Sequence, residues 1–170
     1  MFRRTLIATA FSVGLIGSAS AATLHFQATL NGKSEVPATT SAGTGDLLAT
    51  LDTVSKKLIY TLTFQDLSGP AAAAHFHGPA VAGASAGVAV AIGTALNSPV
   101  TATATLTDAQ MADLEAGKWY VNVHTPANKG GEIRGQVIRT NEGMKMAPMH
   151  PMHPMAKPPA AAPAAAPMKH

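Results

Sequence analysis

The sequence predicts an all-β fold, an immunoglobulin-like or Greek-key β-sandwich with one short connecting helix and a disordered C-terminal tail. Three observations carry this prediction. Apolar and polar residues alternate through about eight short segments, as they do in strands with one buried face. Gly, Pro, Asn and Ser separate these segments at similar spacing. A single stretch near residue 110 follows a helical pattern instead.

Residues 1–21 have the pattern of a secretory signal peptide. Arg3 and Arg4 form a basic start, and the apolar run Leu6–Ile16 is too short to span a bilayer. Ala19-Ser20-Ala21 then provides a small-residue cleavage site. The alternative is an uncleaved membrane anchor. Cleavage predicts a periplasmic or secreted protein without membrane attachment, whose folded domain spans residues 22–140.

The first predicted strand, 23–30, places Leu24, Phe26, Ala28 and Leu30 on one face and ends at Asn31-Gly32. Further strands are expected at 44–52, 57–67, 71–78, 87–93, 99–106, 118–125 and 132–139.

The predicted helix covers residues 108–116, between the strands expected at 99–106 and 118–125. Thr107 and Gln110 have the spacing of a capping box, and Gly117 is a natural C-terminal stop.

Residues 141–170 form the predicted tail. This segment is rich in Pro, Ala, Met and His, and its prolines exclude a regular helix or a paired strand. The Met- and His-containing part is unusual, because exposed methionine gains nothing for a simple tether. Its candidate metal ligands are Met144, Met146, Met149, His150, Met152, His153 and Met155. Thioethers favour Cu(I), so the tail is predicted to bind Cu(I). The alternative is a flexible tether.

Composition excludes several function classes. The chain has no cysteine, which rules out disulfides and thiolate chemistry. Its net charge is +3, and loss of Arg3 and Arg4 with the signal peptide leaves about +1. No basic cluster with interleaved aromatic residues is present, so no nucleic-acid partner is expected. No hydrolase or phosphate-loop motif occurs, and no residue is assigned a catalytic role. Glu132 and Arg134 are expected to form a structural ion pair.

The histidines of the domain all fall on the polar side of their strands. Phe76 lies between His75 and His77, so both histidines point away from the core when Phe76 points into it. The same alternation directs His25 and His124 away from the apolar residues beside them. A shared direction is a requirement for one metal site, and neutral imidazoles suit copper and zinc.

The prediction is a Cu(II) site formed by His75, His77 and His124, with His25 as a fourth ligand or near neighbour. The bend expected at Gly78-Pro79 helps the first two histidines to converge. The alternative is that they are surface polar residues that orient this turn.

Three stretches resemble the CHRD domain, a module named from chordin and common in exported bacterial proteins. They are ATLNGKSEVPATTSAGTGDLLATLD, AHFHGPAVAGASAGVAVAIG and LTDAQMADLEAGKWYVNVHTPANKGGEIRGQV. The resemblance covers nearly all of residues 23–138 and implies an immunoglobulin-like or related β-sandwich. It implies no specific molecular function.

A more distant resemblance connects the chain with copper–zinc superoxide dismutases. HFHGP, GASAG, VNVH and KGGEIRG occur in the order of the dismutase copper strands and loops. By this resemblance His75, His77 and His124 match copper ligands and Arg134 matches the active-site arginine. The bridging histidine, the zinc ligands and the cysteine pair are missing. The resemblance therefore implies a mononuclear copper site at most.

Three functional hypotheses follow. The first is an exported, periplasmic copper-binding protein that buffers copper or delivers it to other exported copper proteins, with Cu(II) at the domain and Cu(I) at the tail. The second is a non-enzymatic structural or interaction module with a flexible tether. The third is a dismutase-like redox enzyme.

Overall fold

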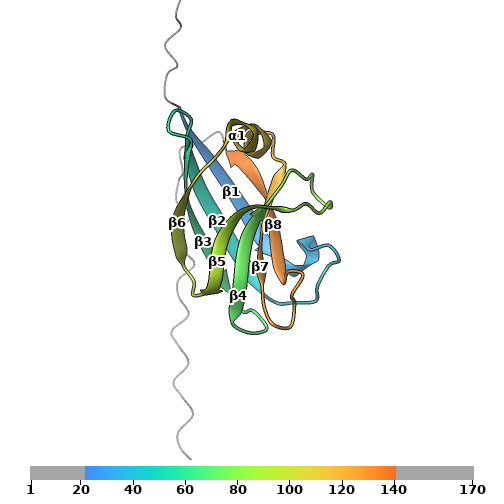
Figure 1. The fold of residues 1–170 in the computed structure, drawn as a ribbon. Helices are drawn as coiled ribbons and strands as arrows, with labels where there is room; N and C mark the ends of the chain where they lie inside the picture. The colour runs from blue at the N-terminus through green and yellow to red at the C-terminus, as the bar shows by residue number, and fades with distance from the viewer. Residues whose placement is uncertain (1–21, 141–170) are drawn as a thin grey trace, which may run out of the picture.

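The structure is a computed structural model that describes residues 22–140 (Figure 1). It contains eight strands, a helix and one turn of 3-10 helix in these residues. They are β1 (Thr23–Asn31), η1 (Gly32–Ser34), β2 (Thr44–Asp52), β3 (Lys57–Gln65), β4 (Ala71–His77), β5 (Val88–Leu96), β6 (Val100–Thr105), α1 (Asp108–Glu115), β7 (Trp119–His124) and β8 (Ile133–Thr140). The all-β prediction with one short helix is confirmed. The signal-peptide and tail predictions lie outside the described residues.

All eight strands belong to one antiparallel sheet in the order β5-β4-β7-β8-β1-β2-β3-β6. The sheet rolls over so far that its two edge strands, β5 and β6, come into contact, which makes the fold nearly barrel-like. Tyr60 on β3 and Phe76 on β4 meet across the interior with ring centroids 5.0 Å apart. These two strands are far apart in the strand order, so the expected sandwich is a single sheet folded over one core.

The core is built from alternate residues of the strands. Leu24, Phe26, Ala28 and Leu30 of β1 are buried, as the alternation predicted. Burying each large apolar side chain of this kind contributes about 1.5–3 kcal/mol to folding. Trp119, on β7, is among the largest fully buried side chains.

Helix α1 covers one end of the rolled sheet (Figure 1). The capping box of Thr107 and Gln110 is present, and Leu114 is buried beneath the helix. Gly117, with φ of 68°, follows the last turn, where a positive φ favours glycine. Neither helix among residues 22–140 has the length and apolar character needed to cross a membrane.

Two loops cover the outer face of β7 and β8, opposite the core. The β4–β5 loop, residues 78–87, is held by Arg134, whose Nη2 donates to Ala84 O at 2.6 Å, and by Tyr120, whose hydroxyl donates to Ala86 O at 3.3 Å. Figure 1 shows this loop and the segment after β1 leaving the sheet on the side of β7 and β8. Polar side chains on this outer face are therefore buried, and the candidate site lies among them.

The expected ion pair between Glu132 and Arg134 is wrong. Glu132 accepts hydrogen bonds from Ser41 and Ser68, whereas Arg134 is directed at Ala84 and over the Tyr120 ring. Glu132 precedes the first residue of β8, so the strand alternation on which the prediction relied does not apply to it.

Candidate metal centre

Neighbouring strands β4 and β7 place three histidines on one outer face. In their antiparallel register His75 is opposite Asn122, His77 is opposite Tyr120, and Ala73 is opposite His124. Alternation directs all of these side chains to the face opposite Phe76. Ala73 ends at its Cβ atom, which leaves room for the His124 ring to lean toward His75.

The register of β4 against β5 shifts between Ala74 and His75 and again between Phe76 and His77. Such irregularities bend a strand and change the direction of its side chains. Each shift leaves an extra residue in β5, Ile92 at the first and Ala89 at the second, so β5 is the bulged strand. Strand β4 keeps a regular register with β7, which holds the histidines of the two strands side by side.

His75, His77 and His124 each offer one nitrogen, and these nitrogens lie within 4.8 Å of one another. The shortest of the contacts joins His75 Nδ1 and His124 Nε2 at 3.0 Å. All three rings are partly exposed. Within residues 22–140 no second group of His, Asp and Glu side chains is arranged in this way.

Two backbone carbonyls determine which nitrogen faces the centre. His77 Nδ1 lies 3.0 Å from Ala86 O, and His124 Nδ1 lies 2.9 Å from Lys129 O. A carbonyl oxygen only accepts, so each Nδ1 carries the proton and donates it. The lone pair of each ring is then on Nε2. This carbonyl–imidazole arrangement is the usual support of a metal-binding histidine.

The resulting donor set is Nε2 of His77 and His124 with Nδ1 of His75. The His75 ring donates from Nδ1 to His124 Nε2 and must carry its proton on Nε2 instead when it binds a metal. Two nitrogens bound to one ion at 2.0–2.1 Å lie about 3.3 Å apart in a tetrahedron and about 4.1 Å apart at most. The observed nitrogens, 3.0 Å apart at the shortest contact and within 4.8 Å overall, need small ring movements to reach this geometry. Three imidazoles leave further coordination positions open.

The surroundings favour the neutral, metal-binding form of two rings. Burial lowers the pKa of His75, and the neighbouring His124 and His77 lower it further. Burial also lowers the pKa of His124; the hydrogen bond to Lys129 opposes this effect, and His77 adds to it. A metal ion competes with protons for imidazole nitrogen, so these lowered pKa values favour binding near neutral pH.

Aromatic stacking holds the ring of His77, the third histidine of the group. The His77 ring is stacked on Tyr120 with centroids 4.7 Å apart and planes 3° from parallel. The Arg134 guanidinium lies 3.3 Å from the centroid of the same Tyr120 ring. Arg134, which the dismutase resemblance matched to an active-site arginine, thus supports His77 through Tyr120 and binds the β4–β5 loop.

A buried polar cluster next to the histidines was not predicted. Asn122 is 2% exposed, and its Oδ1 lies 3.1 Å from His77 Nε2. Glu35 is 6% exposed, and its Oε1 has no hydrogen-bond partner. Burial raises the pKa of Glu35, while the Val36 amide, the charge of Arg134 and the Asn122 amide act against this rise. The strand alternation already placed Asn122 beside His124, but no local pattern distinguished Glu35.

Gly131 makes room for this cluster. A Cβ atom added there would collide with Glu35 Oε1 and would lie 2.7 Å from Asn122 Nδ2. Its φ of 130° also belongs to the region that favours glycine. The carboxylate of Glu35 therefore occupies the space that any other residue at position 131 would need.

The structure does not bring His25 to the other histidines. His25 pairs with Thr140, whereas Asn31, at the other end of β1, pairs with Arg134. The six residue steps from His25 to Asn31 correspond to about 20 Å along the strand. His25 therefore lies toward the other end of the sheet. The seven tail ligands lie outside the described residues.

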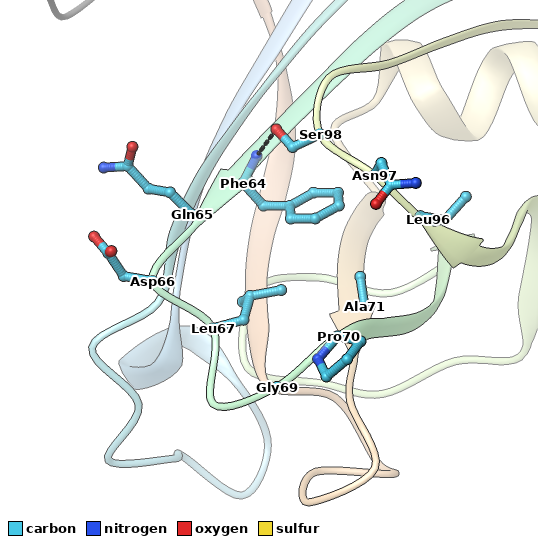
Figure 2. A pocket seen from close by; sticks show the side chains of 10 residues that line it. All are labelled: Phe64, Gln65, Asp66, Leu67, Gly69, Pro70, Ala71, Leu96, Asn97 and Ser98. Carbon is cyan, nitrogen blue, oxygen red and sulfur yellow. Dashed lines mark hydrogen bonds between the residues drawn. The ribbon is translucent and has the colours of Figure 1, made fainter. Parts of the chain in front are cut away.

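Two surface hollows are the alternative sites among the described residues. The first, about 290 Å³, lies between the end of β3, the start of β4 and the β5–β6 turn. Figure 2 shows Phe64 and Leu67 directed into it and Gln65 and Asp66 directed away, and it contains no histidine. The second, about 460 Å³, lies between residues 35–40 and 127–131 and borders the loop that binds His124.

Comparison with known proteins gives one match. The family model described as the CHRD domain matches residues 26–137, which is more than half of the chain. No curated protein and no solved structure matches the chain. The matched range contains all three histidines of the candidate centre, together with Glu35, Asn122 and Arg134.

Proposed function

The chain belongs to the CHRD domain family, as its motifs predicted, and we propose that in this protein the domain binds one copper ion at His75, His77 and His124. The observation that carries the proposal is the convergence of three imidazole nitrogens within 4.8 Å. Two of the three rings are held by backbone carbonyls with Nε2 toward the centre.

Copper is favoured over harder ions by the donor set. Magnesium and calcium prefer oxygen ligands, whereas imidazoles bind copper and zinc. The Met- and His-rich segment 144–155 supports copper over zinc, since thioethers select Cu(I). In this proposal the segment captures Cu(I) and the domain holds Cu(II), and the protein buffers copper or passes it to other exported copper proteins.

Export is part of the same proposal. Residues 1–21 have the pattern of a signal peptide, and the chain lacks cysteine, so it depends on no disulfide outside the cytoplasm. The periplasm is the proposed location.

Membership of the CHRD family favours a second candidate, a structural or interaction module without an enzymatic role. In that case the histidines are only hydrogen-bonding groups that anchor the loops at Ala86 and Lys129. A dismutase-like enzyme, the third hypothesis, rests on motif order alone.

Metal content and electron paramagnetic resonance separate these candidates. The protein is purified from its periplasm without an affinity tag, and its copper is measured. For the spectra, the full-length chain carries His150, His153 and His170 replaced by glutamine, so that four domain histidines remain. One equivalent of Cu(II) should give the signal of a site with several nitrogen ligands.

The decisive variant is His77→Ala, with His25→Ala as its matched control. His77→Ala should replace the signal of the site with several nitrogen ligands by that of loosely bound Cu(II), and it should leave the circular dichroism spectrum unchanged. His25→Ala should keep the signal, because His25 lies outside the group. The copper site would be rejected if the protein from the periplasm contained no copper and the signal of the nitrogen-rich site survived His77→Ala. The structural or interaction module would then be the remaining candidate.

A further inference from the structure

We infer that Asn122 supplies a fourth, oxygen ligand to the same ion and thereby sets the preference of the domain for Cu(II) over Cu(I). This inference rests on the proposed function. Asn122 lies directly opposite His75 in the β4–β7 register, beside His77, and two residues before His124 on the same face. It is therefore at the middle of the three histidines.

The distance from Asn122 to His77 fits two ligands of one ion. Asn122 Oδ1 and His77 Nε2 are 3.1 Å apart. Neighbouring ligands with bonds of 2.0–2.2 Å lie about 2.9–3.4 Å apart, depending on the angle between them. An ion bound to His77 Nε2 is then within reach of the amide oxygen without movement of the backbone.

The contacts of His77 set two lone-pair atoms next to each other. Nδ1 must donate to Ala86 O, which leaves the Nε2 of a neutral ring with a lone pair. That lone pair faces Asn122 Oδ1, which also has lone pairs. A metal ion beside these two atoms accepts a lone pair from each of them. Ala86 and Asn122 thus prepare the site for a cation.

Glu35 keeps the Asn122 amide in this orientation. Both the carboxylate oxygen Oε1 of Glu35 and the amide nitrogen Nδ2 of Asn122 border the space above Gly131. Rotating the amide by 180° would replace Nδ2 with Oδ1 and place two oxygens next to each other. The charge of Glu35 therefore directs Nδ2 toward itself and Oδ1 toward His77. Glu35 is a positioning residue for the proposed ligand.

An amide oxygen discriminates between the two copper ions. Carbonyl-type oxygens are hard donors that stabilise divalent ions, whereas Cu(I) favours soft sulfur ligands and is satisfied by two or three imidazoles. Loss of this oxygen should weaken Cu(II) binding and leave Cu(I) binding nearly unchanged. A residue that only positioned His77 would affect both ions alike.

The test measures both affinities in the full-length chain with the tail histidines replaced by glutamine and the tail methionines by leucine. Cu(II) and Cu(I) are each titrated against a competing chelator. In Asn122→Leu, Cu(II) affinity should fall at least tenfold and Cu(I) affinity should change by less than about twofold. Each tenfold loss of Cu(II) affinity, with Cu(I) affinity unchanged, raises the reduction potential of the bound copper by about 59 mV.

Asn122→Asp combined with Glu35→Gln is the matched variant, because it keeps an oxygen of the same reach and adds a negative charge without placing two carboxylates side by side above Gly131. It should bind Cu(II) at least as tightly as Glu35→Gln alone and lower the reduction potential. Unchanged Cu(II) affinity in Asn122→Leu, equal losses for both ions, or weaker Cu(II) binding in the double variant than in Glu35→Gln would each overturn the inference. Those results leave the three-histidine site intact provided that His77→Ala still removes the signal of the site with several nitrogen ligands.

Discussion

Small residues and backbone carbonyls around the histidines determine how the larger side chains of the site are placed. Gly131 provides the space that the Glu35 carboxylate fills, and Ala73 provides the space into which His124 leans. The carbonyls of Ala86 and Lys129 provide lone pairs that fix the ring protons. Small residues and backbone atoms thus determine the chemistry of the larger side chains.

The role of Gly131 leads to a prediction with a control next to it in the chain. Gly131→Ala should lower the free energy of unfolding by about 1–3 kcal/mol, because the new Cβ collides with Glu35 and the backbone is strained. Gly130→Ala should cost less, since a Cβ there meets nothing within 4 Å. Urea denaturation at neutral pH measures both. Equal effects at the two positions would contradict the packing argument.

Among the loops, Glu132 connects segments that are distant in the chain. Its carboxylate accepts five hydrogen bonds, from Ser41 Oγ, Ser68 N, Ser68 Oγ, Thr125 Oγ1 and Asn128 Nδ2. Burial alone would raise its pKa, but the hydrogen bonds from Ser41, Ser68 and Thr125 outweigh burial and lower the pKa to about 2. The ionised carboxylate therefore stabilises the loops that surround the site.

This pKa predicts how stability depends on pH. A carboxyl whose pKa falls from 4.5 in the unfolded chain to about 2 in the folded chain stabilises the protein above pH 4.5, and this contribution disappears as pH falls toward 2. Its size is about 3 kcal/mol. Glu132→Gln should be less stable than the parent by about 2–3 kcal/mol at pH 7. Denaturation of both proteins at pH 7 and at pH 2.5 measures the difference, which should be much smaller at pH 2.5. A gap that does not shrink with acid would contradict this role.

The strands were predictable from sequence because their alternation is local. β1 and β2 occupy the expected residues apart from one residue at the end of β1, and the capping box fixed the start of α1. The direction of the histidines followed from the same alternation. The convergence of the three histidines could not be predicted from this alternation, because it depends on the pairing of Ala73 with His124, 51 positions further along the chain. The same alternation puts Asn122 on the outer face with His124, but its burial comes from the loops that cover this face. Glu35 enters the cluster from the loop that follows β1.

For the whole molecule, the last strand of the domain ends far from the histidine centre. β8 ends at Thr140, beside His25 of β1, whereas the histidine centre lies toward the opposite end of these strands. All eight strands and the core are contained in residues 22–140. The domain therefore has the elements that it needs for independent folding.

Removal of residues 141–170 should accordingly leave the thermal midpoint and the far-ultraviolet circular dichroism of the domain nearly unchanged. The truncated protein should keep its Cu(II) site and lose most of its capacity for Cu(I). Calorimetry and competition with a Cu(I) chelator measure these two properties. The control is a full-length chain in which the five methionines of 144–155 are leucine, which should match the truncation in Cu(I) capacity. A large drop in the midpoint on truncation would show that the boundary at Thr140 is wrong.

The pairing of β4 with β7 has a consequence for the order of events when the protein folds. More than forty residues, including β5, β6 and α1, separate His77 from Trp119, the first residue of β7, so the pocket does not exist until a long loop has closed. An ion cannot bridge the two strands in the open chain, so it should not speed the steps that precede their pairing. A bound ion must be released before the strands separate. A copper ion at the proposed site should therefore lengthen the lifetime of the native state and leave the rate of folding unchanged.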